Sequence, residues 1–147
     1  MEEEKRTVEK KSVMVPVLSE MLTSGIPNKE WTRFTHLYVT IKDRRGCVTF
    51  EEYYTSRGHH AEKNMLRDQE FLQKIQQDGI VIIMTSNYSP CSECATELIA
   101  FYNDNKKLIQ KFTIQFSHLY RVDKMNNREG LSDLRNAGII LDPKSVE

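Results

Sequence analysis

The sequence has no excess of charge of either sign, because 21 lysine and arginine residues balance 21 aspartate and glutamate residues. Bulk charge therefore does not indicate a nucleic-acid partner, and binding of a polyanion would need local basic loops. No segment approaches the roughly 18 consecutive apolar residues that indicate a membrane helix, so no membrane association is expected. The charged start, M-E-E-E-K-R, is unlike a secretory signal. An intracellular protein, cytoplasmic or nuclear, is expected.

Cysteine is scarce, with three residues in a chain of 147. A chain of this length can bury a real core and needs no disulfide framework. Cys47 stands alone and is expected to be a buried strand residue. Cys91 and Cys94 form a C-x-x-C pair. In a reducing compartment such a pair is more often metal-binding or catalytic than structural.

Internal repeats and low-complexity linkers are also absent from the sequence. Residues 1–12 are expected to be a charged, disordered tail, and residues 13–147 a single domain. Apolar periodicity and turn residues predict helices at residues 13–22, 60–77, 91–105 and 128–136. They predict strands at residues 34–41, 47–54, 80–84, 112–119 and 138–141. The apolar run at residues 80–84 suits a strand buried on both faces. This alternation predicts an α/β fold in which helices flank a mixed sheet.

Two short motifs carry the chemistry, His60-Ala-Glu62 and Pro90-Cys91-Ser-Glu-Cys94. Each is predicted at the start of a helix that follows an element of the sheet, so the two can converge at one sheet edge. One histidine and two thiolates suit zinc with an open fourth position, where a water is acidified towards neutrality. Glu62 lies close enough to His60 to move protons there. H-x-E followed by P-C-x-x-C is the signature of zinc-dependent nucleobase deaminases.

Two other interpretations of these residues remain open. A closed structural zinc site would use His59 as a fourth ligand, but Glu62 would then have no role. A redox C-x-x-C would not need His60. The remaining histidines, His36 and His118, are expected to be hydrogen-bonded strand residues rather than ligands.

Beyond the two motifs, the sequence resembles the activation-induced deaminase/APOBEC-like polynucleotide cytidine deaminases. Residues 86–94 (S-N-Y-S-P-C-S-E-C) are similar to the family's S-W-S-P-C-x-x-C segment. Residues 116–120 (F-S-H-L-Y) resemble its F-x-x-R-L-Y segment, and residues 129–138 (E-G-L-S-D-L-R-N-A-G) resemble its E-G-L-x-x-L-x-x-A-G helix. The resemblance covers residues 31–141. Family members usually continue further, so a compact or trimmed member is expected.

The resemblance implies a cytidine deaminase-like three-layer fold, with a five-stranded mixed sheet made of an antiparallel hairpin and parallel strands. It implies hydrolytic conversion of cytosine to uracil, with one Zn²⁺ on His60, Cys91 and Cys94 and proton transfer by Glu62. Tyr88 stands where the family has tryptophan, and Thr55 where it usually has asparagine. The candidate substrate contacts are Thr35, Thr55, Arg57, Tyr88, Ser89, Tyr120 and Arg121.

Local charge favours a polynucleotide substrate. Residues 28–34, 55–59 and 120–129 each carry a formal charge of +1, about +3 around the expected pocket mouth. With nearby aromatic residues, this pattern suits a single strand whose target base is inserted into the pocket. Single-stranded DNA is favoured and RNA is the other nucleic-acid candidate. A free cytidine or deoxycytidine nucleotide deaminase is the alternative enzyme, and an inactive zinc-stabilised interaction module is the alternative without activity.

Overall fold

The computed structural model describes residues 34–56, 60–119 and 124–143 of the chain. The tail expected at residues 1–12 and the helix expected at residues 13–22 lie outside these ranges. The elements are β1 (His36–Lys42), β2 (Val48–Thr55), α2 (Ala61–Arg67), α3 (Gln69–Lys74), β3 (Ile80–Tyr88), α4 (Ser92–Asn105), β4 (Ile109–His118), α5 (Met125–Ala137) and β5 (Ile140–Pro143).

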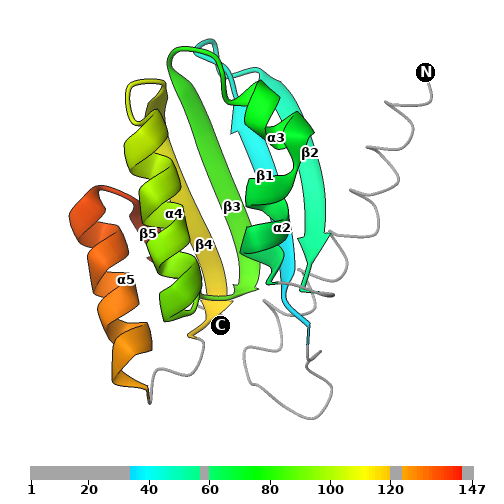
Figure 1. Cartoon of the computed structure of the whole chain (residues 1–147). Coiled ribbons are helices and arrows are strands. Elements are labelled where there is room, and N and C mark those ends of the chain that lie inside the picture. The colour runs from blue at the N-terminus through cyan, green and yellow to red at the C-terminus, as the bar shows by residue number, and fades with distance from the viewer. Residues whose placement is uncertain (1–33, 57–59, 120–123, 144–147) are drawn as a thin grey trace.

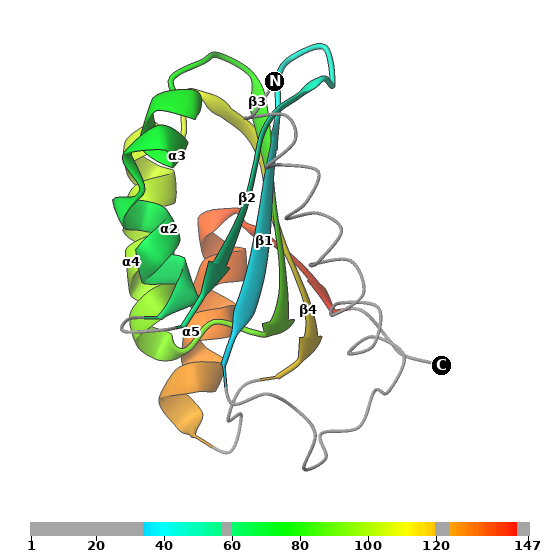
Figure 2. The ribbon, with the colours of Figure 1, turned by 90° about the vertical axis from the view of Figure 1, so that its right-hand side faces the viewer.

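The strands form one mixed sheet in the order β2-β1-β3-β4-β5. Strand β1 is antiparallel to both β2 and β3, whereas β4 is parallel to β3 and to β5. Figure 1 shows the sheet behind helices α2, α3, α4 and α5, and the edge-on view in Figure 2 places these helices on one side of it. The predicted five-stranded mixed sheet of a hairpin and parallel strands is confirmed, with the described helices as a layer on one face. The third layer of the expected three-layer fold is not formed by the described residues.

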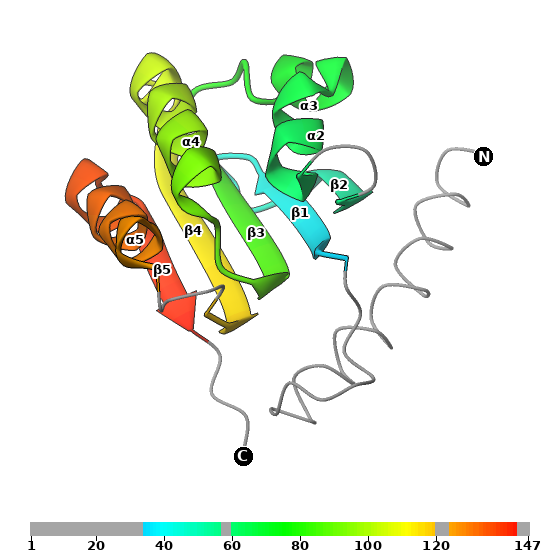
Figure 3. The same cartoon turned by 60° about the horizontal axis from the view of Figure 1, so that its bottom comes forward.

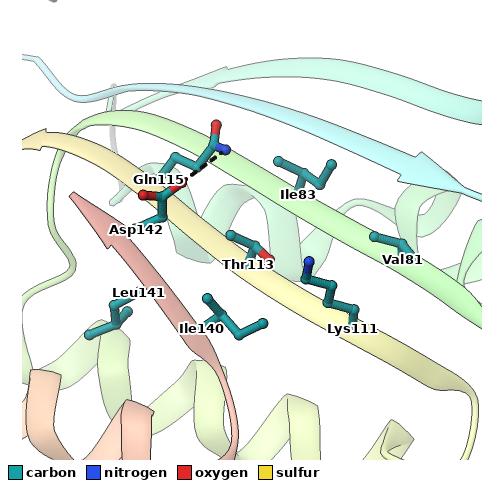
Figure 4. Close-up of a pocket in the computed structure, with 8 residues that line it drawn as sticks. All are labelled: Val81, Ile83, Lys111, Thr113, Gln115, Ile140, Leu141 and Asp142. Atoms are coloured by element: carbon teal, nitrogen blue, oxygen red, sulfur yellow. Dashed lines mark hydrogen bonds between the residues drawn. The ribbon is translucent and has the colours of Figure 1, made fainter. Parts of the chain in front are cut away.

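The core lies between the sheet and this helix layer. Every second residue of a strand points to the same face, and on the helix-covered face Val39, Ile82 and Met84 are fully buried. On the other face Val81 and Ile83 are only half-buried. Together with polar residues of β4 and β5, they line a shallow pocket of about 290 Å³ (Figure 4). The prediction that this strand is buried on both faces is therefore wrong.

The continuous helix predicted at residues 60–77 is interrupted at Asp68. This residue has an extended backbone, with φ −76° and ψ 113°, and its side chain caps α3 by accepting a hydrogen bond from the Glu70 N–H. The Tyr54 hydroxyl donates to the Asp68 carboxylate at 2.6 Å and anchors the break to strand β2. Aspartate favours such capping positions over helix interiors. Apolar periodicity alone does not show this break, because it continues across it.

Helices α4 and α5 pack side by side. A Cβ atom added to Gly130 of α5 would lie 3.2 Å from both the Cβ of Ala95 and the Cα of Ser92 in α4. The glycine therefore permits the close approach of α5 to the start of α4. Helix α5 ends at Gly138, which has a left-handed φ of 108°.

No helix in the described ranges is long and apolar enough to span a membrane.

Cys47 is exposed in the turn between β1 and β2, so the prediction of a buried strand residue is wrong. In this turn the Asp43 side chain accepts hydrogen bonds from the backbone N–H groups of Arg45 and Cys47, each at 2.9 Å. Gly46 has a positive φ of 86°. The turn therefore extends one residue further than predicted, and β2 begins at Val48.

Candidate metal centre and active site

Helices α2 and α4 begin at the same end of the sheet. Figure 3 brings this end forward and shows the starts of α2 and α4 beside the ends of β3 and β4. His60 is the N-cap residue of α2, and Cys91 is the N-cap residue of α4. Cys94 follows in the first turn of α4 and is fully buried. The convergence predicted for the two motifs is therefore present.

The three candidate ligands form one cluster. The Nδ1 atom of His60 lies 3.1 Å from the Sγ of Cys94 and 3.5 Å from the Sγ of Cys91. One ligand atom from each residue lies within 4.8 Å of the other two. Bond lengths of about 2.3 Å to sulfur and about 2.0 Å to nitrogen place tetrahedral zinc ligands roughly 3.5 Å apart. The residues thus fit a metal ion, with two thiolates and one imidazole as ligands.

Glu62 is buried beside this cluster, with 7% of its surface exposed. Burial, which disfavours the charged carboxylate, raises the pKa of Glu62 to about 7, and the neighbouring Cys91 thiolate also raises it. A carboxyl group with a pKa near neutrality can both take up and release a proton. The position of Glu62 suits the proton transfer that the H-x-E motif predicts.

The two cysteine side chains are coupled by a hydrogen bond. This bond from Cys94 lowers the pKa of Cys91 to about 5, and the backbone N–H of Cys94 further favours the Cys91 thiolate. The same hydrogen bond, together with burial, raises the pKa of Cys94. The lowered pKa of Cys91 favours the thiolate, the form that binds metals.

An ion pair joins the two motifs. The ammonium group of Lys63, which follows Glu62 in α2, lies 2.6 Å from a carboxylate oxygen of Glu93, which stands between the two cysteines in α4. The hydrogen bond from Lys63 lowers the pKa of Glu93, and the same contact raises the pKa of Lys63. The pair links the histidine-bearing helix to the cysteine-bearing helix at the surface of the site.

Asn127 supports the cysteine-bearing helix from α5. Its side chain is 5% exposed, and its Oδ1 accepts a hydrogen bond from the Ser92 N–H at 2.9 Å. The Cys91 sulfur already caps this helix by accepting a hydrogen bond from the Cys94 N–H. Asn127 satisfies a second backbone N–H at the same helix start. The sequence analysis missed this role, because no local pattern links residues 35 positions apart.

We expect Asn127→Ala to lower the free energy of unfolding by about 1–2 kcal/mol, because it removes the buried Asn127 amide and leaves the half-buried Ser92 N–H without this acceptor. Chemical denaturation of the metal-loaded protein measures this loss. Asn127→Asp is the matched control, since it retains an acceptor oxygen at the same position. Equal losses in the two variants would show that the Ser92 cap is not the cause.

Four of the candidate substrate contacts lie at the same sheet end as the metal ligands. Thr35 precedes β1, Thr55 ends β2, Tyr88 ends β3 and Ser89 follows it. The Tyr88 ring meets the His118 ring edge-on, with centroids 6.5 Å apart. The other three candidate contacts and the alternative ligand lie outside the described residues: Arg57, Tyr120, Arg121 and His59.

Asn87 is a further supporting residue that the sequence analysis missed. It is fully buried. Its side chain accepts from the His36 N–H at 2.8 Å and donates to the Phe34 carbonyl at 3.2 Å. It thereby fixes the backbone on both sides of Thr35 against β3. A polar residue at the end of an apolar strand was the available signal, but its partners lie 51 and 53 positions earlier in the sequence.

His36 and His118 are hydrogen-bonded strand residues, as predicted. His36 bonds through Nδ1 to the Tyr53 hydroxyl and stacks on that ring. His118 contacts the Ser117 hydroxyl through its Nδ1 at 3.4 Å. Neither histidine belongs to the metal-ligating cluster found among the described residues.

The mixed sheet, with a histidine and two cysteines at the starts of two helices, defines the class of cytidine deaminase-like proteins. A family model described as invertebrate AID/APOBEC deaminase matches residues 17–147. The chain therefore belongs to the invertebrate AID/APOBEC deaminase family, whose members are zinc-dependent.

A relative in the cat, Felis catus, is described as the DNA dC->dU-editing enzyme APOBEC-3H. It is 29% identical to this chain over 115 residues, which cover 78% of this chain. The match spans 58% of the relative's length.

Proposed function

We propose that this protein catalyses the zinc-dependent hydrolytic deamination of cytosine to uracil in single-stranded polynucleotides, with DNA favoured over RNA. The observation that carries the proposal is the buried Glu62 carboxyl beside the His60, Cys91 and Cys94 ligand atoms. A structural metal site needs no buried acid of this kind.

His60, Cys91 and Cys94 would hold one Zn²⁺, leaving a fourth position for a water molecule. Zinc bound in this way lowers the pKa of that water towards 7 and makes it a nucleophile at neutral pH. His60 is the exposed ligand and Cys94 the buried one, so the open position is expected on the solvent side of the cluster.

Glu62 would act as the proton carrier. It would accept one proton of the attacking water and pass it to a ring nitrogen of the base, then take the proton of the new hydroxyl at C4 and pass it to the amino group, which leaves as ammonia. Its burial supports this role, because burial raises the pKa of the carboxyl towards neutrality, where it can both take up and release a proton. Water and cytosine thus become uracil and ammonia.

A polynucleotide substrate is supported by the family and by the residues around the site. The relative in the cat is named for editing dC to dU in DNA. Tyr88 offers an aromatic face beside the site on which a base can stack. Thr35, Thr55 and Ser89 lie at the same end of the sheet as polar candidates for contacts with the target nucleotide. We include Arg57, Tyr120 and Arg121 as proposed contacts with the strand.

A deamination assay on four substrates tests the substrate class: single-stranded DNA, single-stranded RNA, deoxycytidine monophosphate and cytidine. We expect kcat/KM to be highest for single-stranded DNA and to fall as salt rises, because phosphate contacts release counterions. A preference for the free nucleotide or nucleoside would instead identify a nucleotide-pool enzyme.

Tyr88→Ala should reduce kcat/KM for the strand by about tenfold, the effect of losing one base-stacking contact.

A further inference from the structure

A second concentration of basic side chains lies at the end of the sheet opposite the metal centre. The β1–β2 turn, the start of β3 and the α4–β4 connection meet there, at the top of Figure 1. We name this surface the distal basic patch, and its residues are Lys42, Arg44, Arg45, Lys106, Lys107 and Lys111. Two acidic residues, Asp43 and Asp78, share these turns, leaving a formal charge of +4 in a chain whose net charge is zero. The formal charges of Lys74 and Asp104, which lie near the ends of α3 and α4, cancel and do not change this sum.

The two carboxylates of the patch are already engaged. Asp43 accepts hydrogen bonds from two backbone N–H groups of its own turn. Asp78 pairs with Arg44 at 2.5 Å. Within the part of the chain that the structure describes, no carboxylate lies in an ion pair with Arg45, Lys106 or Lys107. These three side chains are exposed. The Lys106 ammonium lies 6.0 Å from the centroid of the Tyr102 ring, a contact that leaves its charge available to an outside anion.

The distal basic patch contains a depression, and one of its arginines takes part in an ion pair. A depression of about 420 Å³ in this surface is lined by two basic residues, one acidic residue and four uncharged ones: Arg44, Lys107, Asp78, Gly79, Leu108, Ile109 and Gln110. The Arg44 side chain lies against Gly79, where an added Cβ would come within 2.9 Å of its Nε. The Asp78 carboxylate pairs with its guanidinium, and the two side chains are 70% and 69% exposed. The N–H donors that Asp78 leaves free on this exposed guanidinium can contact a phosphate.

The basic side chains continue onto the sheet face opposite the described helices. Lys42 and Lys111 flank Val81 on the two neighbouring strands, so their backbones lie about 10 Å apart. Figure 4 shows Lys111 at one end of the shallow pocket on this face. Cations spread over such a span suit an extended polyanion better than one small anion.

We propose that the distal basic patch binds the phosphate backbone of a single-stranded polynucleotide whose target base occupies the metal centre. This inference rests on the proposed function for the strand's identity. Strand β4 has 10 residues, so the two ends of the sheet lie roughly 30 Å apart. A strand rises about 3.4 Å per nucleotide when stacked as in a duplex and up to about twice that when extended, so roughly five to ten nucleotides on one side of the target base reach from one end to the other. The patch therefore adds affinity to long substrates and none to short ones.

The test compares two double variants of the full-length, zinc-loaded protein. Lys106→Glu/Lys107→Glu reverses two charges of the patch. Arg67→Glu/Arg135→Glu is the matched control, because it changes net charge equally and also alters exposed residues in the last turns of helices. Figure 1 shows that α2 and α5 end short of the distal turns.

Three quantities are measured for each protein. They are the KM for deamination of a cytosine at the centre of DNA strands of about 8 and about 40 nucleotides, and the affinity for oligothymidine of about 40 nucleotides. We expect the patch variant to raise KM for the long strand about tenfold, to leave KM for the short strand within about twofold, and to weaken oligothymidine binding with a salt slope reduced by roughly 1.4. The control variant should match the wild type throughout.

The outcomes separate this inference from the proposed function. If the patch variant keeps the wild-type KM for the long strand and the wild-type affinity for oligothymidine, the proposed role of the distal basic patch is wrong, even if the enzyme deaminates normally. Equal weakening by the control variant would also overturn it, because the effect would then be one of net charge. Loss of oligothymidine binding in the patch variant alone, in a protein without deaminase activity, would support the patch and contradict the proposed function. Binding of the wild type to phosphatidylserine vesicles is measured as a separate control. Binding to these vesicles but not to oligothymidine would identify a membrane site and overturn the inference.

Discussion

The Glu62→Gln variant is expected to retain one zinc ion per chain and to lose deaminase activity by at least about a thousandfold, the scale of a lost proton carrier. The ligands His60, Cys91 and Cys94 are unchanged in this variant, so metal binding should persist. The amide is similar in size to the carboxyl but cannot carry the proton from water to base and leaving group. Steady-state deamination kinetics and metal analysis of the same preparation measure both parts of this prediction.

Glu97→Gln is the matched control for this substitution. Glu97 is exposed on α4, one turn beyond the metal-ligating cysteines, and the substitution makes the same change in charge. Its activity should stay within about twofold of the wild type, as for ordinary surface substitutions. If Glu62→Gln retained wild-type turnover, another group would have to carry the proton, and the role proposed for Glu62 would be wrong.

The second large effect is expected for Cys91→Ser, which should purify with less than about a tenth of the zinc of the wild type and without measurable activity. A serine hydroxyl stays protonated at neutral pH and is a poor zinc ligand. Loss of the metal also removes the coordination bonds that would link α2 to α4, so the melting temperature should fall. Metal analysis and thermal denaturation measure the two effects.

Cys47→Ser separates ligand loss from cysteine loss in general. Cys47 is exposed in the β1–β2 turn, at the opposite end of the sheet from the cluster. This variant should keep full zinc content, activity and melting temperature. A Cys91→Ser protein that retained zinc as firmly as Cys47→Ser would contradict the assigned ligand set.

Much of the fold could be predicted from the sequence, because its signals are local. The turn at residues 43–46 separates two strand-like segments, and the structure confirms the hairpin. The break at Asp68 could not be predicted from periodicity, because the hydroxyl that fixes it belongs to Tyr54 on another element. The burial of residues 80–84 was overestimated, since the described helices cover one face of the sheet.

The candidate metal site was predictable for a similar reason. The ligands fall in two short motifs, and each motif lies at a helix start, so the fold class brings them together. The buried amides of Asn87 and Asn127 were not predictable, because their partners are backbone groups distant in the sequence. The distal basic patch could not be predicted by counting charges along the sequence, because its residues come from segments that are far apart in the chain. Local patterns thus identify reactive residues, whereas the fold determines what supports them.

Deamination in water labelled with heavy oxygen tests the central claim most directly. The zinc-loaded protein is incubated with a cytosine-containing single strand of DNA, and the product base is examined by mass spectrometry. The account predicts uracil with one labelled oxygen at C4 from the wild type, and unchanged cytosine from Glu62→Gln. Unchanged cytosine from the zinc-loaded wild type, or uracil without solvent oxygen, would contradict hydrolytic deamination at this site.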